Sequence, residues 1–183
     1  MSCHGGKIAR SGKRQSENRV ASMKVSDLIN ASSVFLNFEA KNKREALRQL
    51  ADKFQAVHSG VNAKCLFSAL MDREELGSTG LGNGIAIPHA KSEEIPEPRG
   101  FLAVSKKGID FQALDGELVH VLFLMVYPQN PVGVHLTVLA GLARLLRDDF
   151  VVGLIRRSAT AGQVSKIIRE QEKRIKALAE NRL

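Results

Sequence analysis

The stretch LVHVLFLMVYP, residues 118–128, constrains the fold more than any other part of the sequence. Apolar residues occupy both of its alternating faces, which is typical of a central strand that is covered on both sides. The chain has 183 residues, of which 44% are hydrophobic, so it is able to bury a core of this kind. We therefore expect a sheet with further elements packed on both of its faces.

The rest of the chain mixes strand and helix patterns without a regular βαβ alternation or an internal repeat. This mixture predicts an α/β fold, a sandwich of helices around a mixed β-sheet in a single domain. Further strands are predicted at 32–38, 85–88 and 99–108, and helices after Asn42, after Asn62, after Asn130-Pro131, near 150–156 and over 161–180.

The net charge of +8 lies in the two ends of the chain. Residues 1–22 carry five Lys/Arg and one acid, residues 156–183 carry eight and three, and residues 23–155 carry fourteen and fifteen. Residues 1–22 have almost no apolar content, and we expect them to form a disordered basic N-terminal extension. Basic ends are usually solvated, so nucleic-acid binding, lost on deletion of residues 1–22, is a remote alternative.

The composition also bears on the compartment of the protein. The longest apolar run is far shorter than a membrane span, and the first residues lack the apolar region of a secretory signal. Two cysteines, one of them in the basic end, do not make a disulfide framework. We therefore expect a cytoplasmic protein that does not insert into a membrane.

The segment REELGSTGLGNGIAIPHAK, residues 73–91, is the strongest candidate for a functional site. Its glycine-rich loop, 77–84, has neither the Lys-Ser/Thr of a P-loop nor the glycine spacing of a dinucleotide site. No cofactor is therefore predicted, and a phosphate group would have to arrive already activated. The simplest interpretation of the loop is a turn between a helix and a strand. Alternatively, Ser78, Thr79 and the backbone N–H groups of the loop could bind an anion.

His89 follows Pro88, where the predicted strand ends, so we expect its imidazole to be exposed in a loop and held in one orientation. Neutral imidazole is a nucleophile, and its ordinary pKa of about 6.5 leaves it mostly neutral in the cytoplasm. In phosphoryl transfer, the protein contributes mainly the positioning of the nucleophile and positive charge around the phosphoryl oxygens. His89 is thus either a phosphoryl acceptor or an ordinary loop histidine.

Two other side chains could support a phosphoryl group. His135 lies in the first turns of a predicted helix, where N–H groups and a partial positive charge favour anions, but it could equally be a buried core histidine. Arg73 could offset phosphoryl charge, or it could simply be a cation at a helix C-terminus. A zinc site from His89, His120 and His135 lacks any short ligand spacing, so no metal is predicted.

The segment 73–91 strongly resembles the active-site segment of the enzyme IIA domains of the phosphoenolpyruvate-dependent phosphotransferase system, in the fructose/mannitol/nitrogen-regulatory group. HLTVLAGLARLL, residues 135–146, resembles the second histidine motif of that family, and residues 109–128 resemble the strands between the two motifs. The resemblance covers about Lys24 to Ile168 and is greatest to the nitrogen-regulatory type. It implies an enzyme IIA-like phosphoacceptor domain at 23–168, followed by a basic C-terminal helical end at 169–183.

The resemblance also implies roles for particular residues. His89 matches the phosphorylated histidine, His135 the histidine that stabilises the phosphoryl group, and Arg73 the arginine that offsets its charge. Thr79 is a weaker match to a residue that hydrogen-bonds the phosphoryl group. The donor would be the phosphohistidine of an HPr-type phosphocarrier, and the chain would act as a phosphotransferase with a phosphohistidine intermediate.

Two outputs are compatible with this chemistry. A bacterial nitrogen-regulatory protein would regulate targets, such as a potassium transporter or a sensor kinase, through its phosphorylation state. A sugar-specific enzyme IIA of the fructose or mannitol type would instead pass the phosphoryl group to a IIB component. We expect the regulatory role.

Overall fold

The computed structural model describes residues 23–129 and 134–180, so the predicted disorder of residues 1–22 lies outside the described part of the chain. The strands β2 to β6 follow one another along the described chain, with helices before and after them. In chain order they are α2 (Val25–Leu28), the 3-10 helix η1 (Ala31–Ser33), β1 (Val34–Leu36), α3 (Lys43–Val57), α4 (Ala63–Glu75), β2 (Gly80–Gly82), β3 (Ile85–Ala86), β4 (His89–Ser92), β5 (Arg99–Ile109), β6 (Val119–Pro128), α5 (Val134–Leu146), α6 (Asp149–Arg157) and α7 (Ala161–Glu180).

The predicted central strand is β6. The sheet has six strands in the order β1-β5-β6-β3-β2, and β4 also pairs with β6. β6 runs antiparallel to β5 and parallel to both β3 and β4, while β1 pairs in parallel with β5. The sheet is therefore mixed, as the sequence predicts.

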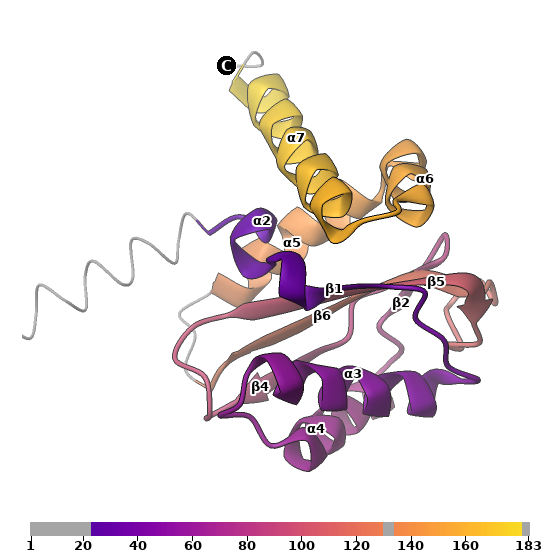
Figure 1. Ribbon diagram of the computed structural model, residues 1–183, viewed down its shortest axis with the longest axis vertical. Helices are drawn as coiled ribbons and strands as arrows, with labels where there is room; N and C mark the ends of the chain where they lie inside the picture. Colours follow the sequence, from indigo (N-terminus) through magenta and orange to yellow (C-terminus); the bar gives the residue numbers. More distant parts are fainter. Residues whose placement is uncertain (1–22, 130–133, 181–183) are drawn as a thin grey trace, which may run out of the picture.

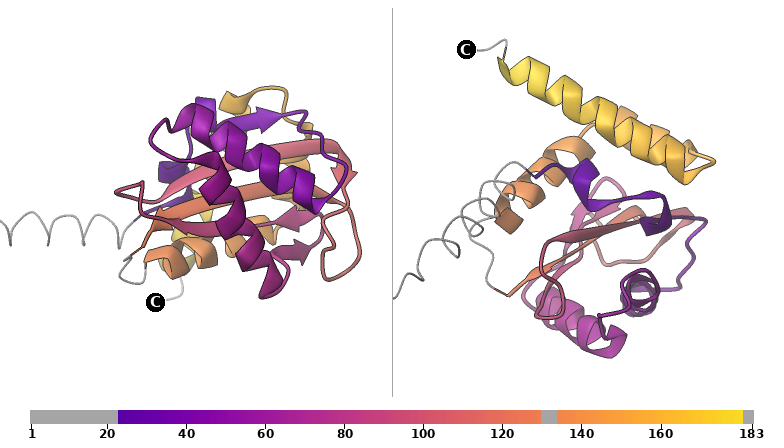
Figure 2. Two further views of the ribbon diagram at one scale, coloured as in Figure 1. Left: turned by 90° about the horizontal axis from the view of Figure 1, so that it is seen from below. Right: turned by 60° about the vertical axis from the view of Figure 1, so that its left-hand side comes forward.

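Helices cover both faces of the sheet (Figures 1 and 2). Helices α3 and α4 lie on one face, and α2, α5, α6 and α7 lie on the other. The side chains of β6 alternate between the two cores because successive residues of a strand point to opposite faces. Val121, Phe123, Met125 and Tyr127 join the core under α5, and Leu122, Leu124 and Val126 join the core under α3 and α4.

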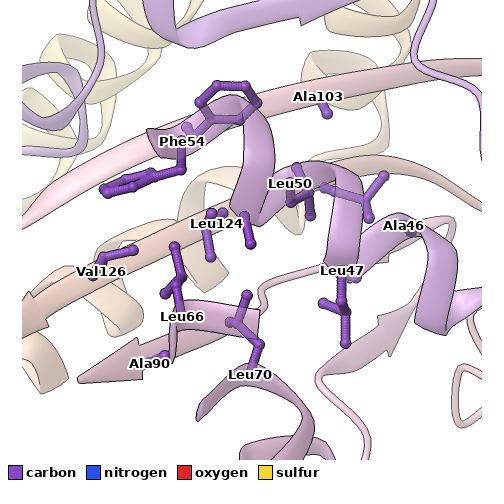
Figure 3. Packing of buried hydrophobic residues seen from close by; sticks show 14 of the residues in the cluster. Ala46, Leu47, Leu50, Phe54, Leu66, Leu70, Ala90, Ala103, Leu124 and Val126 are labelled. Carbon is purple, nitrogen blue, oxygen red and sulfur yellow. The ribbon is translucent and has the colours of Figure 1, made fainter. Parts of the chain in front are cut away.

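The core under α3 and α4 fixes the position of α4 against the sheet (Figure 3). Leu66 and Leu70 of α4 pack with Leu47, Leu50 and Phe54 of α3 against the sheet. Ala90 of β4 belongs to the same cluster, so α4 is held directly against β4.

The beginning of the described chain differs from the prediction of one strand over 32–38. The strand β1 spans only Val34–Leu36, and a 3-10 helix precedes it. The side chain of Asn30 accepts hydrogen bonds from the backbone of Ser32 and Ser33 and so favours a turn there. At Ser32 and Ser33, local capping by Asn30 therefore determines the backbone more strongly than strand propensity does.

The glycine-rich stretch 77–84 is only partly a loop. Its residues Gly80–Gly82 form β2, which pairs antiparallel with β3. Asn83 and Gly84 form the connection with φ of 53° and 73°, the backbone that a two-residue hairpin requires. The Asn-Gly pair was thus a hairpin signal, and the prediction of a continuous loop was wrong.

The prediction that the strand stops at Pro88 was also wrong. β3 ends at Ala86, but β4 begins at His89 and pairs with β6 in the register that β3 began. The carbonyl oxygen of Pro88 accepts a hydrogen bond from the backbone N–H of Met125 at 2.9 Å. Proline lacks only the donor, so the pairing continues through its acceptor.

The last helix, α7, runs without a break through residues 168–169, the boundary at which the sequence places a separate C-terminal end. None of the helices in the described ranges combines the length and the apolar content needed to cross a bilayer.

Replacing Leu124 by Ala tests the central role of β6. Leu124 is fully buried, so we expect Leu124→Ala to lower the free energy of unfolding by about 2–5 kcal/mol, as measured by urea denaturation. Leu114 is 80% exposed, and Leu114→Ala should change that free energy by less than about 0.5 kcal/mol. Equal effects of the two substitutions would contradict the assignment of β6 as the core strand.

Candidate functional site

His89 is the first residue of β4, beside Met125 of β6. Its neighbour Ala90 points into the core under α3 and α4, so strand alternation turns His89 toward the α5 face. The ring of His89 is half-buried, and its centroid lies 6.5 Å from the centroid of the Tyr127 ring. His89 is therefore held at the start of a strand, rather than in a loop.

Both ring nitrogens of His89 make hydrogen bonds that define its protonation. The Nε of Arg73 donates to Nε2 of His89 at 3.0 Å, and Nδ1 of His89 lies 2.9 Å from the carbonyl oxygen of Ile87. A guanidinium has only donors and a carbonyl only accepts, so the proton is assigned to Nδ1. The lone pair, which makes an imidazole a nucleophile, is therefore on Nε2 and faces Arg73.

Arg73 reaches this position from the last turn of α4, which packs against β4. Its Nη1 donates to the carbonyl oxygen of Gly77 at 3.0 Å, so one guanidinium bridges the histidine and the loop after the helix. Such a fork fixes the orientation of the positive charge beside Nε2. The structure thus brings together two of the residues that the sequence predicts for the site.

Tyr127 is a neighbour that the sequence analysis missed. Its side chain is buried next to His89, and burial raises the pKa of its phenol because the charged form is disfavoured away from water. The nearby guanidinium of Arg73 acts in the opposite direction on that pKa and is the smaller effect. Tyr127 therefore stays neutral up to a higher pH than usual and adds an uncharged aromatic ring beside His89.

Thr79 is almost entirely buried, and both of its donors point to Glu74. Its backbone N–H donates to Oε1 of Glu74 at 3.0 Å, and its hydroxyl donates to the same oxygen. The hydroxyl of Ser78 donates to the carbonyl oxygen of Gln112 at 3.1 Å. The hydroxyls of Ser78 and Thr79, which the sequence suggests as anion ligands, instead donate to Gln112 and Glu74 and so fix the loop to the rest of the domain.

Glu74 and Lys43 were also missed by the sequence analysis. Oε2 of Glu74 lies 3.0 Å from Nζ of Lys43, the first residue of α3. Glu74 directly follows Arg73 in the quoted segment, which was a local signal, but Lys43 lies on another helix and has no such signal.

The other histidines have different surroundings. His135 is the second residue of α5, in line along the helix with Val138 and Leu142, which pack on the face of the sheet toward which His89 points. The side chain of His135 lies outside the described side chains. Nδ1 of His120 lies 3.0 Å from the carbonyl oxygen of Ser105. Within the described residues, no three His, Cys, Asp or Glu side chains are grouped to hold a metal ion.

Comparison with known proteins identifies the family of this chain. Residues 27–171 match the family model of the phosphoenolpyruvate-dependent sugar phosphotransferase system, EIIA 2. The chain belongs to this family. Proteins of the EIIA 2 family are phosphotransferases that use a phosphohistidine.

The EIIA 2 relatives include both regulatory and sugar-specific proteins. The chain is 34% identical over 146 residues to the nitrogen regulatory protein of Bradyrhizobium diazoefficiens, covering 80% of this chain and 95% of that protein. It is 28% identical over 151 residues to the fructose-specific EIIABC component of Bacillus subtilis, covering 82% of this chain but 24% of that protein.

A solved EIIA 2 structure agrees with the fold. The crystal structure of the nitrogen regulatory protein IIA-Ntr from Neisseria meningitidis matches with a TM-score of 0.74 and 28% identity, covering 79% of this chain and 98% of that one. The predicted sandwich of helices around a mixed sheet is therefore confirmed.

Tyr127 provides a direct test of burial at the site because it is the only tyrosine in a chain without tryptophan. We expect the tyrosinate absorbance of the folded protein to appear with a midpoint above about 10, and that of the urea-unfolded chain at about 10. Since the folded state holds the proton more tightly, the stability that Tyr127 contributes is present below the unfolded pKa and is lost as pH rises through the folded pKa. A folded midpoint at or below the unfolded one would contradict this description.

Proposed function

We propose that the protein is a regulatory phosphoryl acceptor of the phosphoenolpyruvate-dependent phosphotransferase system. It takes a phosphoryl group from a phosphohistidine on an HPr-type carrier protein onto His89. Its phosphorylation state then regulates target proteins in the cytoplasm.

The observation that carries this proposal is the pair of hydrogen bonds at His89. The carbonyl oxygen of Ile87 accepts from Nδ1 and the guanidinium of Arg73 donates to Nε2, so the nucleophilic lone pair already faces a cation. Phosphoryl transfer needs a positioned nucleophile and positive charge around the phosphoryl oxygens, and the two hydrogen bonds of His89 support its assignment as that nucleophile. Membership of a phosphohistidine family supports the same assignment.

The transfer forms one N–P bond and breaks another. The lone pair on Nε2 of His89 attacks phosphorus, and the electron pair of the broken P–N bond returns to the imidazole of the carrier. The Nδ1 proton remains on His89, where the carbonyl oxygen of Ile87 stabilises the positive charge that develops on the ring. For this attack, Arg73 turns its donors from Nε2 to the phosphoryl oxygens, which frees the lone pair of Nε2.

His135 is assigned as a second stabiliser of the phosphoryl group. It lies in the first turn of α5, whose backbone N–H groups and partial positive charge favour an anion. Thr79 contributes by holding the loop through Glu74, in place of the direct hydrogen bond to the phosphoryl group that the sequence suggests.

The regulatory output is supported by similarity that spans nearly the whole length of a nitrogen regulatory protein. Phosphorylation adds about two negative charges, which can create or block a protein interface near His89. The targets would be proteins such as a potassium transporter or a sensor kinase.

The similarity to a fructose-specific EIIABC component favours a second candidate, a sugar-specific enzyme IIA. That function requires His89 to pass its phosphoryl group to a IIB component. Adding a purified fructose-type or mannitol-type IIB to the phosphorylated protein separates the two roles, because only the sugar-specific protein would lose its phosphoryl group rapidly.

Nucleic-acid binding through residues 1–22 is the third prediction from the sequence, and deletion of these residues tests it.

Intact-protein mass spectrometry tests the acceptor directly. After incubation with phosphoenolpyruvate, enzyme I and an HPr-type carrier, we expect the wild type to gain one acid-labile phosphoryl group. His89→Ala should gain none, and His120→Ala is the matched control because His120 bonds to Ser105 and not to Arg73. Full phosphorylation of His89→Ala would contradict the proposal.

His135→Ala separates stabilisation from nucleophilic attack in the same assay. We expect a slower transfer that still reaches His89, with an unchanged far-ultraviolet circular dichroism spectrum, because a stabilising group is lost and the nucleophile is retained. Complete loss of transfer in a folded His135→Ala variant would contradict the assignment of His135 as a stabiliser that assists the attack without being required for it.

A further inference from the structure

We infer that Glu74, paired with Lys43, is a positioning residue that sets the tautomer of His89 through Thr79 and Ile87. The inference rests on the proposed function for its effect on phosphoryl transfer. Its effect on the tautomer concerns the unphosphorylated protein and can be measured independently.

The burial of the Glu74 carboxylate has to be compensated by neighbouring groups. Its side chain is 4% exposed, and that of its partner Lys43 is 15% exposed. Removing a carboxylate from water is costly unless it is paired and hydrogen-bonded, and here Lys43 compensates the charge at Oε2. Nζ of Lys43 also lies 5.3 Å from the centre of the Phe111 ring, which restricts where the ammonium can move.

The carboxylate is the first member of a chain of hydrogen bonds that ends at the nucleophile. Oε1 of Glu74 accepts from both the backbone N–H and the hydroxyl of Thr79. The carbonyl oxygen of Thr79 accepts from the backbone N–H of Ile87 at 3.0 Å. The carbonyl oxygen of that same Ile87 accepts from Nδ1 of His89 at 2.9 Å. Glu74 thereby holds, through Thr79, the residue whose carbonyl oxygen selects the Nδ1–H tautomer.

The end of α4 therefore controls both ring nitrogens of His89. Arg73 donates to Nε2, and the next residue, Glu74, acts on Nδ1 through Thr79 and Ile87. The turn that follows, residues 74–77, is closed by the N–H of Gly77, which donates to the carbonyl oxygen of Glu74 at 3.1 Å. A shift of Glu74 would displace the tautomer-setting carbonyl relative to the guanidinium.

The position of Lys43 predicts how an uncharged isostere behaves at position 74. A glutamine amide has one accepting oxygen, and in Glu74→Gln this oxygen turns toward the ammonium of Lys43. The amide NH₂ then faces Thr79, whose backbone N–H loses its acceptor and whose hydroxyl must rotate to accept from the amide instead of donating to it. When Lys43 is replaced by Met as well, the amide oxygen is free to turn back to Thr79, so Lys43→Met/Glu74→Gln should restore the arrangement.

The experiment compares Glu74→Gln with the double variant Lys43→Met/Glu74→Gln in two assays. Glu39→Gln is the matched control, because Glu39 forms an exposed ion pair with Lys107 at 2.9 Å. The first assay reads the ring nitrogens of His89 by long-range proton–nitrogen correlation NMR at a pH where histidine is neutral. His120 serves as an internal reference, since its Nδ1 faces a carbonyl oxygen in a different part of the sheet. The second assay is the rate of transfer from the phosphorylated carrier.

We expect Glu74→Gln to shift His89 from the Nδ1–H tautomer toward a mixture, with the signals of His120 unchanged. Transfer should slow by about tenfold to a hundredfold, because the nucleophile is misplaced. The double variant should recover most of the tautomer and of the rate, and Glu39→Gln should match the wild type. Where Glu74→Gln does not fold, Thr79→Val, which removes the hydroxyl alone, is compared with Thr79→Ser, which keeps it.

A folded Glu74→Gln protein with the wild-type tautomer of His89 would overturn the inference. So would a double variant that recovers neither the tautomer nor the rate of transfer. Equal tautomers in Thr79→Val and Thr79→Ser would also overturn it. Failure of the proposed function looks different. In that case even the wild type accepts no phosphoryl group from a charged carrier, while the tautomer shift in Glu74→Gln is still observed.

Discussion

The parallel pairing of β3 and β4 with β6 is the interaction on which the site depends. Ile85 pairs with Val121 and His89 with Met125, so the two short strands keep one register along the buried central strand. Between them the backbone of Ile87 donates to Thr79 and accepts from His89. A rigid central strand thus determines where the ring of His89 lies, and the break between β3 and β4 determines which of its nitrogens is protonated.

Two charges of opposite sign at the end of α4 have different roles because their surroundings differ. Glu74 is buried and compensated by Lys43, so the pair adds little net charge to the site. Arg73 donates to His89, so its positive charge lies where the proposed function places an incoming phosphoryl group. The raised pKa of Tyr127 keeps its phenol neutral, so the phenol adds no charge beside His89 and Arg73. This separation of a buried, compensated anion from a cation beside His89 is consistent with the proposed phosphoryl acceptance at His89.

Much of this arrangement could be predicted from local patterns. A strand that is apolar on both faces predicts a covered sheet, and β6 occupies that position. Arg73 and His89 were predicted from one short segment, and their side chains meet at 3.0 Å. The Asn-Gly pair between β2 and β3 is also a local hairpin signal, because both of its residues adopt a positive φ.

Other features depend on partners that are distant in the sequence. The resumption of pairing after Pro88 follows from the neighbouring strand β6, which the local break at a proline does not reveal. Glu74 continues the buried face of Leu66 and Leu70 at helical spacing, whereas its neighbour Glu75 is exposed. The ion pair that compensates its charge is made with Lys43 on another helix, and no local pattern shows that partner. Tyr127 becomes part of the site only because β4 lies beside β6.

The most direct test of the account is to locate the N–P bond in the phosphorylated protein. With histidines labelled by nitrogen-15, a one-bond coupling between phosphorus and nitrogen identifies the atom that carries the phosphoryl group. The account predicts this coupling at Nε2 of His89, the nitrogen that faces Arg73. Coupling at Nδ1 of His89, or at a nitrogen of any other histidine, would contradict it.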